Sequence, residues 1–275
     1  MTQVILRGIP RDGDNRRPSI KHAKLCFERH IDISTQLQRH VIAAGLLRDD
    51  GLIILASSEK NTIITFNMSG AGIDFIPVEF PPYDITATDT TTVAITLPEA
   101  QRIDVYEITT KSTKVKSIDI SYCCFKLTCI KNKLIVACSE NILLFKDLIR
   151  DVSVPFETPV SADDSLSSSG DRIYHSNYVR NTLTCYHDDG IKLYHVDLGE
   201  KPQGMTCIFD NRLLVLMKDG KLRLVSSDGH TFKLLQYEDH KLKDPRITSY
   251  NHKLKKMFIA NRHGFLNRYC VGDIL

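Results

Sequence analysis

A chain of 275 residues, 42% of them hydrophobic, carries enough apolar material for a substantial core, in one large domain or two ordinary ones. Its 36 Lys and Arg nearly balance its 33 Asp and Glu, which excludes a strong overall field that would recruit nucleic acid or acidic membranes without specificity. No apolar run approaches the roughly 18 residues of a membrane helix, and Arg7 interrupts the first apolar stretch, so we expect no membrane span and no secretory signal.

Residues 1–24 differ from the rest of the chain because basic side chains dominate them. Asp12 and Asp14 accompany a larger set of cations: Arg7, Arg11, Arg16, Arg17, Lys21 and Lys24. We predict a basic flexible segment that serves as a linker or tail, and a basic arm for nucleic acid is the alternative. Residues 25–275 then form the folded domain.

From residue 50 onward one pattern recurs about every 40 residues. Each copy has a β-forming run that ends at a small or apolar residue, followed by a run that ends at a large one. The first marker falls at Ala56, Thr96, Ala137, Ser176, Leu216 and Ala260. The second falls at Phe66, Tyr106, Phe145, Tyr186, Val225 and Tyr269. Two markers that recur with the same spacing over six copies indicate a β-propeller, because a blade cannot bury both its faces alone and must stack against its neighbours.

Each copy also supplies a run before the first marker, such as "FKLTCI", and an outer run, such as "IKLYHVDL", which makes four strands per blade. The last copy, ending in "FLNRYC", lacks an outer strand. The run "CFERHIDIS", residues 26–34, is the candidate that would pair with the last blade and leave no sheet edge open. The sequence therefore predicts an all-β fold, a six-bladed β-propeller of four-stranded antiparallel blades closed by an N-terminal strand.

One spacing of apolar and turn residues is shared by "PPYDIT", "KNKLIVACSENILLFKDL", "GDRIYHSNYVRNTLTCYHDDG" and "KPQGMTCIFDNRLLVLMKDGKLRLV". This pattern resembles the NHL-type six-bladed propeller that forms the C-terminal half of tripartite-motif proteins, especially the invertebrate ones. The resemblance covers residues 26–273 and lies in the spacing of the repeated runs more than in individual residues. It implies a module of the ubiquitin pathway that recognises a substrate or an RNA, or a stand-alone relative of such a module. The RING, B-box and coiled-coil segments of those ligases have no counterpart in this sequence.

The sequence carries no recognisable catalytic motif. Its eight cysteines include no C-x-x-C, so we interpret them as reduced core thiols of a cytoplasmic protein and predict no metal and no cofactor. Gly70-Ala71-Gly72 indicates a turn rather than a phosphate loop, because no Gly-Lys-Ser/Thr follows. No Gly-x-Ser-x-Gly elbow occurs, and the histidines are scattered along the chain. We therefore predict no catalytic residue.

The enzyme alternative is a calcium-dependent lactonase-like hydrolase, a class of propeller that places metal ligands where the innermost strands enter the central channel. The equivalent positions, two residues before the inner-strand Thr or Ser, are Asp84, Lys126, Ser165, Gly204 and Arg246. A Ca²⁺ site takes six to eight oxygens, several of them from carboxylates. One carboxylate beside two cations disfavours such a site.

The turns between the second and third strands of each blade are expected at the same end as the start of the innermost strands, so both sets contribute to one face. In blades four to six that face carries Arg180, Lys218, Arg246 and Arg262 against Asp219. The candidate binding residues are Tyr83, Asp84, Lys126, Tyr178, Arg180, Lys218, Arg246 and Arg262.

Tyr and Arg at the centre of a mixed-charge face favour a protein or peptide partner, because these residue types dominate interface energies. Single-stranded RNA is the alternative, since the basic half of the face could bind it with Tyr178 as a stacking platform. We thus predict a non-catalytic module that binds a protein or peptide, with RNA binding and the hydrolase as first and second alternatives.

Overall fold

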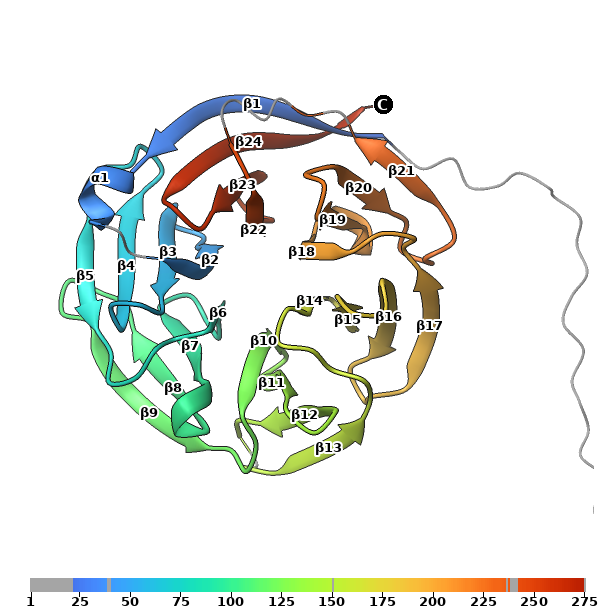
Figure 1. Cartoon of the computed structure of the whole chain (residues 1–275), viewed down its shortest axis with the longest axis horizontal. Helices are drawn as coiled ribbons and strands as arrows, with labels where there is room; N and C mark the ends of the chain where they lie inside the picture. Colours follow the sequence, from blue (N-terminus) through green and yellow to red (C-terminus); the bar gives the residue numbers. More distant parts are fainter. Residues whose placement is uncertain (1–21, 39–40, 150, 236, 238–241, 275) are drawn as a thin grey trace, which may run out of the picture.

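The computed structural model describes residues 22–38, 41–149, 151–235, 237 and 242–274, which form a ring of six four-stranded antiparallel sheets around a central channel (Figure 1). The predicted six-bladed β-propeller is therefore confirmed. The basic segment predicted for residues 1–24 lies outside the described residues except for its last three positions. Within the described ranges, no helix is long and apolar enough to cross a membrane.

The first three blades run from the innermost strand outwards. Blade 1 contains β2 (Ile42–Leu47), β3 (Leu52–Ser57), β4 (Thr62–Asn67) and β5 (Asp74–Pro77). Blade 2 contains β6 (Asp84–Ala87), β7 (Thr92–Leu97), the 3-10 turn η1 (Pro98–Ala100), β8 (Arg102–Glu107) and β9 (Thr113–Asp119). Blade 3 contains β10 (Cys124–Ile130), β11 (Lys133–Cys138), β12 (Ile142–Asp147) and β13 (Ser153–Glu157).

The last three blades follow the same order. Blade 4 contains β14 (Ser165–Ser169), β15 (Arg172–Asn177), β16 (Thr182–His187) and β17 (Lys192–Asp197). Blade 5 contains β18 (Pro202–Cys207), the 3-10 turn η2 (Phe209–Asn211), β19 (Leu213–Met217), β20 (Leu222–Val225) and β21 (Phe232–Leu235). Blade 6 contains β22 (Pro245–Asn251), β23 (Lys256–Asn261), β24 (Phe265–Ile274) and β1 (His22–Asp32). All first markers of the repeat lie in second strands and all second markers in third strands.

β1 is the outer strand of blade 6, so strands from the two ends of the described chain close the ring, as the sequence predicted (Figure 1). It pairs antiparallel with β24 along almost its whole length. Glu28 of β1 adds ion pairs to Lys256 of β23 and to Arg268 of β24, the second at 3.0 Å between Oε2 and Nε. Closure leaves every innermost strand facing the channel and every blade with a neighbour on both sides.

The bounds of this closing strand differ from the predicted residues 26–34. The strand starts earlier, at His22, because its partner β24 is ten residues long and offers backbone groups that far. It ends at Asp32, whose carboxylate accepts hydrogen bonds from the backbone N–H and the hydroxyl of Ser34 at 2.9 and 2.6 Å. This local turn replaces ladder pairing and leads into the short helix α1 (Ser34–Leu37).

Closure also places Cys26 of β1 directly opposite Cys270 of β24. Opposite residues of an antiparallel pair have Cβ atoms about 4.5–5.5 Å apart, only slightly more than a disulfide requires. We expect mild oxidation with copper phenanthroline to link the two thiols, as detected by non-reducing peptide mapping, and Cys26→Ser to abolish the link. No link, or a link from Cys26 to another cysteine, would contradict this register.

The apolar core is distributed over the interfaces between neighbouring blades. Each interface contains one cluster of buried hydrophobic side chains, such as Ile54 and Ile63 of blade 1 with Ile95 of blade 2. The second strands are buried on both faces: β3 and β7 each bury five of their six residues. The β-branched runs of the sequence are therefore core strands, and stability depends on each blade having both neighbours.

Hydroxyl side chains of the innermost strands join neighbouring blades around the channel. Thr206 Oγ1 accepts a hydrogen bond from the backbone N–H of Tyr250 at 3.1 Å, and Ser249 Oγ accepts one from the N–H of Leu47 at 3.0 Å. These residues belong to the repeated runs "GMTCI" and "RITSY". The recurrence of Thr and Ser in those runs thus has a structural cause.

Candidate recognition site at the mouth of the channel

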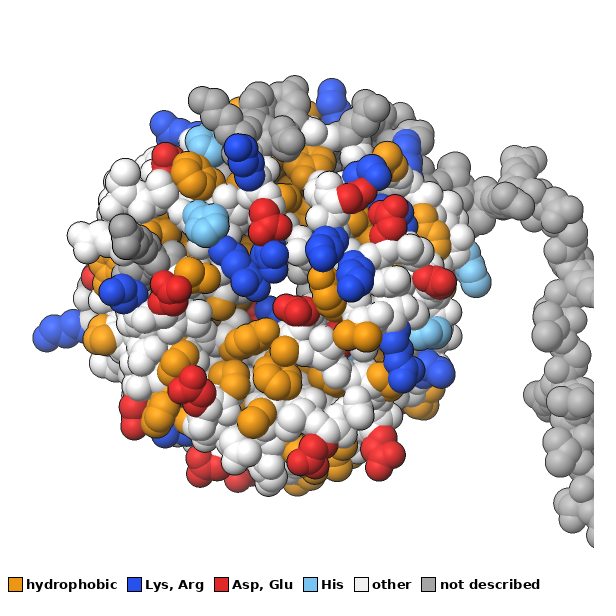
Figure 2. Space-filling view, viewed as in Figure 1, with side chains coloured by type: hydrophobic (Ala, Val, Ile, Leu, Met, Phe, Trp, Pro, Cys, Tyr) orange, Lys and Arg blue, Asp and Glu red, His pale blue; other side chains and the backbone are white. Residues whose placement is uncertain are grey.

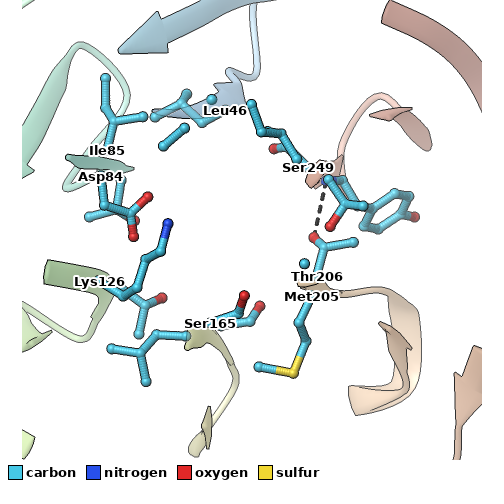
Figure 3. Close-up of a pocket in the computed structure, with 18 of the residues that line it drawn as sticks. Leu46, Asp84, Ile85, Lys126, Ser165, Met205, Thr206 and Ser249 are labelled. Carbon is cyan, nitrogen blue, oxygen red and sulfur yellow. Dashed lines mark hydrogen bonds between the residues drawn. The ribbon is translucent and has the colours of Figure 1, made fainter. Parts of the chain in front are cut away.

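The innermost strands of all six blades line the central channel, a cavity of about 340 Å³ (Figure 3). The positions compared for the calcium alternative all lie on its wall: Asp84, Lys126, Ser165, Gly204 and Arg246. Asp84, Ser165 and Gly204 each lie opposite the first marker of their blade. In blade 6 the residue opposite that marker is Ile247, because β22 has a bulge between Pro245 and Ile247, so the predicted equivalence of Arg246 is wrong. Figure 3 shows Asp84 and Lys126, from the neighbouring strands β6 and β10, pointing into this cavity.

A second cavity, of about 160 Å³, lies where the turns meet the mouth of the channel, and we call it the mouth cavity. Its lining consists of Val41, Ile42, Ala43, Ser58, Tyr83, Lys126, Asp163, Tyr178, Gln203, Arg246 and Arg262. Turn residues such as Tyr178 and Arg262 therefore meet inner-strand residues such as Lys126 and Arg246, as the predicted shared face requires. On this face, Lys and Arg side chains gather on the side of the opening that lies over β18 and β22, and hydrophobic side chains gather on the opposite side (Figure 2).

Tyr83 has a fixed position on the rim of the mouth cavity. Its hydroxyl donates a hydrogen bond to the carbonyl of Ala162 at 3.0 Å, and its ring meets that of Phe125 edge-on, with 5.7 Å between centroids. The Lys126 ammonium lies over the Tyr83 ring, 5.0 Å from its centroid. Burial, assisted by the negative charge of Asp163, raises the pKa of Tyr83 to about 12. The hydroxyl therefore stays protonated, and a donor, at neutral pH.

Asp84 lies on the channel wall beside Lys126. Its carboxylate accepts a hydrogen bond from the backbone N–H of Leu127 at 3.0 Å, which joins blades 2 and 3. The side chain keeps some exposed surface, but that surface opens into the narrow channel. Burial therefore raises the pKa of the Asp84 carboxyl above its ordinary value, while the Lys126 charge and the Leu127 N–H oppose this. Asp84 thus has a structural role as well as a charge.

The raised pKa of Asp84 makes the stability of the protein depend on pH. The folded state holds this proton more tightly than the unfolded chain does. The stability that the protonated carboxyl contributes is therefore present at acidic pH and is lost as the pH rises through the folded pKa. We therefore expect Asp84→Asn to gain stability relative to the parent as the pH rises from about 4, the ordinary pKa of an Asp carboxyl, through the higher folded pKa. Thermal denaturation of both proteins over this range is the measurement. Parallel pH profiles would contradict the assignment.

Tyr178 is positioned by a buried network that the sequence did not reveal. Asp164 Oδ1 accepts a hydrogen bond from the backbone N–H of Tyr178 at 2.8 Å. Asp164 Oδ2 accepts from His175 Nε2 at 2.7 Å and from the backbone N–H of Ser161 at 2.9 Å. Asp164 and His175 are 0% and 2% exposed. The network ties the loop before β14 to the turn after β15. Lys201 Nζ lies over the Tyr178 ring, 4.8 Å from its centroid.

The mouth cavity has a positive charge balance among the described residues. Lys126, Arg246 and Arg262 line it, against the single acid Asp163. Arg246 forms an ion pair with Asp244, at 2.9 Å between Nε and Oδ2. Arg262 is exposed and, like Lys126, has no described carboxylate within ion-pair distance. Arg262 is therefore available to a negatively charged ligand, while Lys126 also acts on the Asp84 carboxylate across the channel wall.

Two of the predicted binding residues lie outside both cavities. Arg180 is exposed on its turn, where its backbone N–H donates to Asn177 Oδ1 at 2.8 Å. Lys218 lines a separate cavity between blades 5 and 6, with Asp219 and Pro245 among its other residues. The structure therefore divides the basic half-face that the sequence predicted, and only Arg246 and Arg262 of that set line the mouth cavity.

Sequence reasoning missed Asp163, Gln203 and the contribution of the innermost strand of blade 1. Gln203 occupies a β-bulge of β18, between Pro202 and Gly204, and counting along a regular strand does not locate a bulge. Asp163 precedes β14 in a loop whose path is set by the neighbouring Asp164. For blade 1 a signal did exist, because "IAAGLL" is an apolar run of strand length directly before the turn "RDDG".

Comparisons with known proteins show the fold of this chain. No family model and no curated protein matches the sequence. Among solved structures, virginiamycin B lyase from Staphylococcus aureus is 12% identical with a TM-score of 0.66, covering 92% of this chain and 100% of its own. A luciferin-regenerating enzyme is 10% identical with a TM-score of 0.69, covering 90% and 97%. The Pan2 WD40 domain from Neurospora crassa is 12% identical with a TM-score of 0.63, covering 85% and 76%. The chain is therefore a β-propeller that is similar in structure to enzymes and to a WD40 domain alike.

Proposed function

We propose that this propeller is a recognition module that binds a protein or peptide partner over the mouth cavity. The observation that supports this most is the meeting of two anchored tyrosines, Tyr83 and Tyr178, with Lys126, Arg246 and Arg262 in one concave site. Tyr and Arg in a central, well-packed pocket supply most of the binding energy in protein interfaces. The Tyr83 hydroxyl is already held by a hydrogen bond, and the Tyr178 backbone is held by one to Asp164, so a partner would lose less free energy in ordering this part of the site.

Single-stranded RNA is the first alternative, and the geometry of the rings favours it less. Lysine ammonium groups lie over one side of both rings, Lys126 over Tyr83 and Lys201 over Tyr178. A base that stacked on those sides would have to displace a cation from a favourable contact. Arg180, which the RNA hypothesis used together with Tyr178, does not line the cavity.

An enzyme is the second alternative, since a lyase and a luciferin-regenerating enzyme share the fold. The channel offers a poor calcium site: Asp84 accepts the Leu127 N–H and lies beside Lys126, and Asp49 accepts a hydrogen bond from Asn251 Nδ2 at 2.7 Å. In the described part of the chain, no group of three or more His, Cys, Asp or Glu is placed to hold a metal. These contacts support a recognition role over a metal-dependent hydrolase.

The resemblance of the repeats to tripartite-motif propellers gives this proposal a finer form. In that form the module selects substrates for a ubiquitin ligase, or acts as a stand-alone relative. The fold is compatible with both.

The test compares peptide and RNA binding by the whole chain. The immobilised protein is panned against a random dodecapeptide phage library and, in parallel, against a random single-stranded RNA pool at low and high salt. We expect peptide enrichment that the double variant Tyr178→Ala/Arg262→Ala lowers at least about tenfold. Lys116→Ala, which removes an exposed cation from the outer strand β9, is the control and should enrich peptides as the parent does.

The outcomes of this test separate the alternatives. RNA enrichment that falls steeply with salt, without peptide enrichment, would replace the proposal by RNA recognition. Enrichment of neither ligand would contradict both binding proposals.

A further inference from the structure

We propose that the mouth cavity binds a carboxylate side chain, an Asp or Glu, of the partner segment, and this inference rests on the proposed recognition function. The cavity holds about 160 Å³, well below the roughly 300–1,000 Å³ of pockets that enclose whole small-molecule ligands. A single inserted side chain suits this size better than a nucleotide or a cofactor does.

The charges around the cavity select an anion. Arg262 has no ion-pair partner among the described residues, and Arg246 forms an ion pair with Asp244 through Nε. An arginine guanidinium carries five N–H donors in a planar fork that matches a carboxylate. Lys126 supplies a third cation at the inner end, steadied over the Tyr83 ring. An acidic side chain in the cavity would thus meet three cationic side chains whose N–H donors lack a full set of protein acceptors.

A neutral donor completes the site. The side-chain oxygen of Gln203 is buried and has no hydrogen-bond partner among the described residues. A half-turn of the amide exchanges its oxygen and nitrogen and would present N–H groups to a carboxylate. A buried amide oxygen without a partner is costly, and after this rotation the N–H groups in its place would donate to a carboxylate in the mouth cavity.

Asp163 sets the specificity of the site. It is the acid among the described lining residues and is exposed at the rim. Its charge opposes a second negative group next to the first, so the cavity favours one acidic side chain over a run of acids. Asp163→Asn is therefore expected to tighten the binding of an acidic peptide.

The experiment uses the peptides enriched from the phage library, made with a fluorescent label, and the whole chain. Each peptide is compared with its Asp→Asn or Glu→Gln counterpart by fluorescence anisotropy, at low and at high salt. We expect replacement of the peptide's carboxylate by an amide to weaken binding about tenfold, which corresponds to about 1.4 kcal/mol. We expect Arg262→Ala and Lys126→Met to weaken binding of the acidic peptide similarly while leaving its amide counterpart almost unaffected. Lys116→Ala is the control, and thermal denaturation confirms that each variant is folded.

The outcomes distinguish this inference from the proposed function beneath it. Enriched peptides without an acidic residue, or amide counterparts that bind equally well, would overturn the carboxylate site and leave peptide recognition intact. Absence of any peptide enrichment would overturn both.

Discussion

Replacement of Asp164 by Ala is expected to lower the free energy of unfolding by about 3 to 5 kcal/mol. Asp164 is completely buried, and its carboxylate accepts hydrogen bonds from His175 Nε2 and from the backbone N–H groups of Ser161 and Tyr178. Alanine would leave these donors without an acceptor, and each buried unsatisfied group costs about 1–3 kcal/mol. Urea denaturation followed by circular dichroism measures the change.

The control for this prediction is the neighbouring carboxylate. Asp163 is exposed, so Asp163→Ala is expected to change stability by no more than about 0.5 kcal/mol. Equal effects of the two substitutions would show that the Asp164 network does not hold this loop. The network also places Tyr178, so Asp164→Ala should weaken partner binding even under conditions where the variant is folded.

The second large effect is expected at the ring closure, for Ile31→Asp. Ile31 lies on β1, is 3% exposed and belongs to the core cluster between blades 6 and 1, which includes Phe66 and Leu266. The substitution removes this packing and buries an unpaired carboxylate, so we expect a loss of about 3 to 5 kcal/mol. A strand that contributes to closure should show this loss in the cooperative unfolding of the whole propeller, not as local fraying.

Lys24→Asp is the matched control, because it places the same side chain on the same strand at an exposed position. We expect it to change stability by no more than about 0.5 kcal/mol. A small effect of Ile31→Asp, or loss of hydrogen-exchange protection confined to β1, would mean that the ring stays folded without its closing strand.

The architecture was predictable because its cause is repeated along the chain. Each second strand is buried on both faces, so small or apolar residues such as Ala56, Ala137 and Ala260 recur at matching positions. The pattern remains visible over six copies although single copies deviate from it, as at Ser176. The closing strand was predictable because the last copy lacks an outer strand. Its exact ends were not, because they depend on the length of β24 and on the hydrogen bonds of Asp32 to Ser34.

The candidate site was only partly predictable, since it is built from what differs between the copies. The repeat assigned Lys126 and Arg246 to innermost strands, and every innermost strand faces the channel, although both residues lie in bulges of those strands. A bulge near the start of the innermost strand occurs in β2, β10, β18 and β22, but counting along a regular strand does not locate it. The loop fixed by Asp164 depends on hydrogen bonds that sequence spacing does not encode. Arg262 lines the mouth cavity and Arg180 does not. This difference depends on how far each turn extends over the channel, which sequence spacing does not encode.

The central claim, that a peptide partner binds over the mouth cavity, is tested most directly by mapping where a bound peptide lies. A phage-selected peptide that carries a photoreactive group is irradiated with the whole chain, and the modified residues are identified by mass spectrometry. We predict modification around the mouth, at Tyr83, Tyr178 and Arg262, and its loss when unlabelled peptide competes. Modification concentrated on the outer strands, such as β13 or β17, would contradict the claim and place recognition on the rim of the ring.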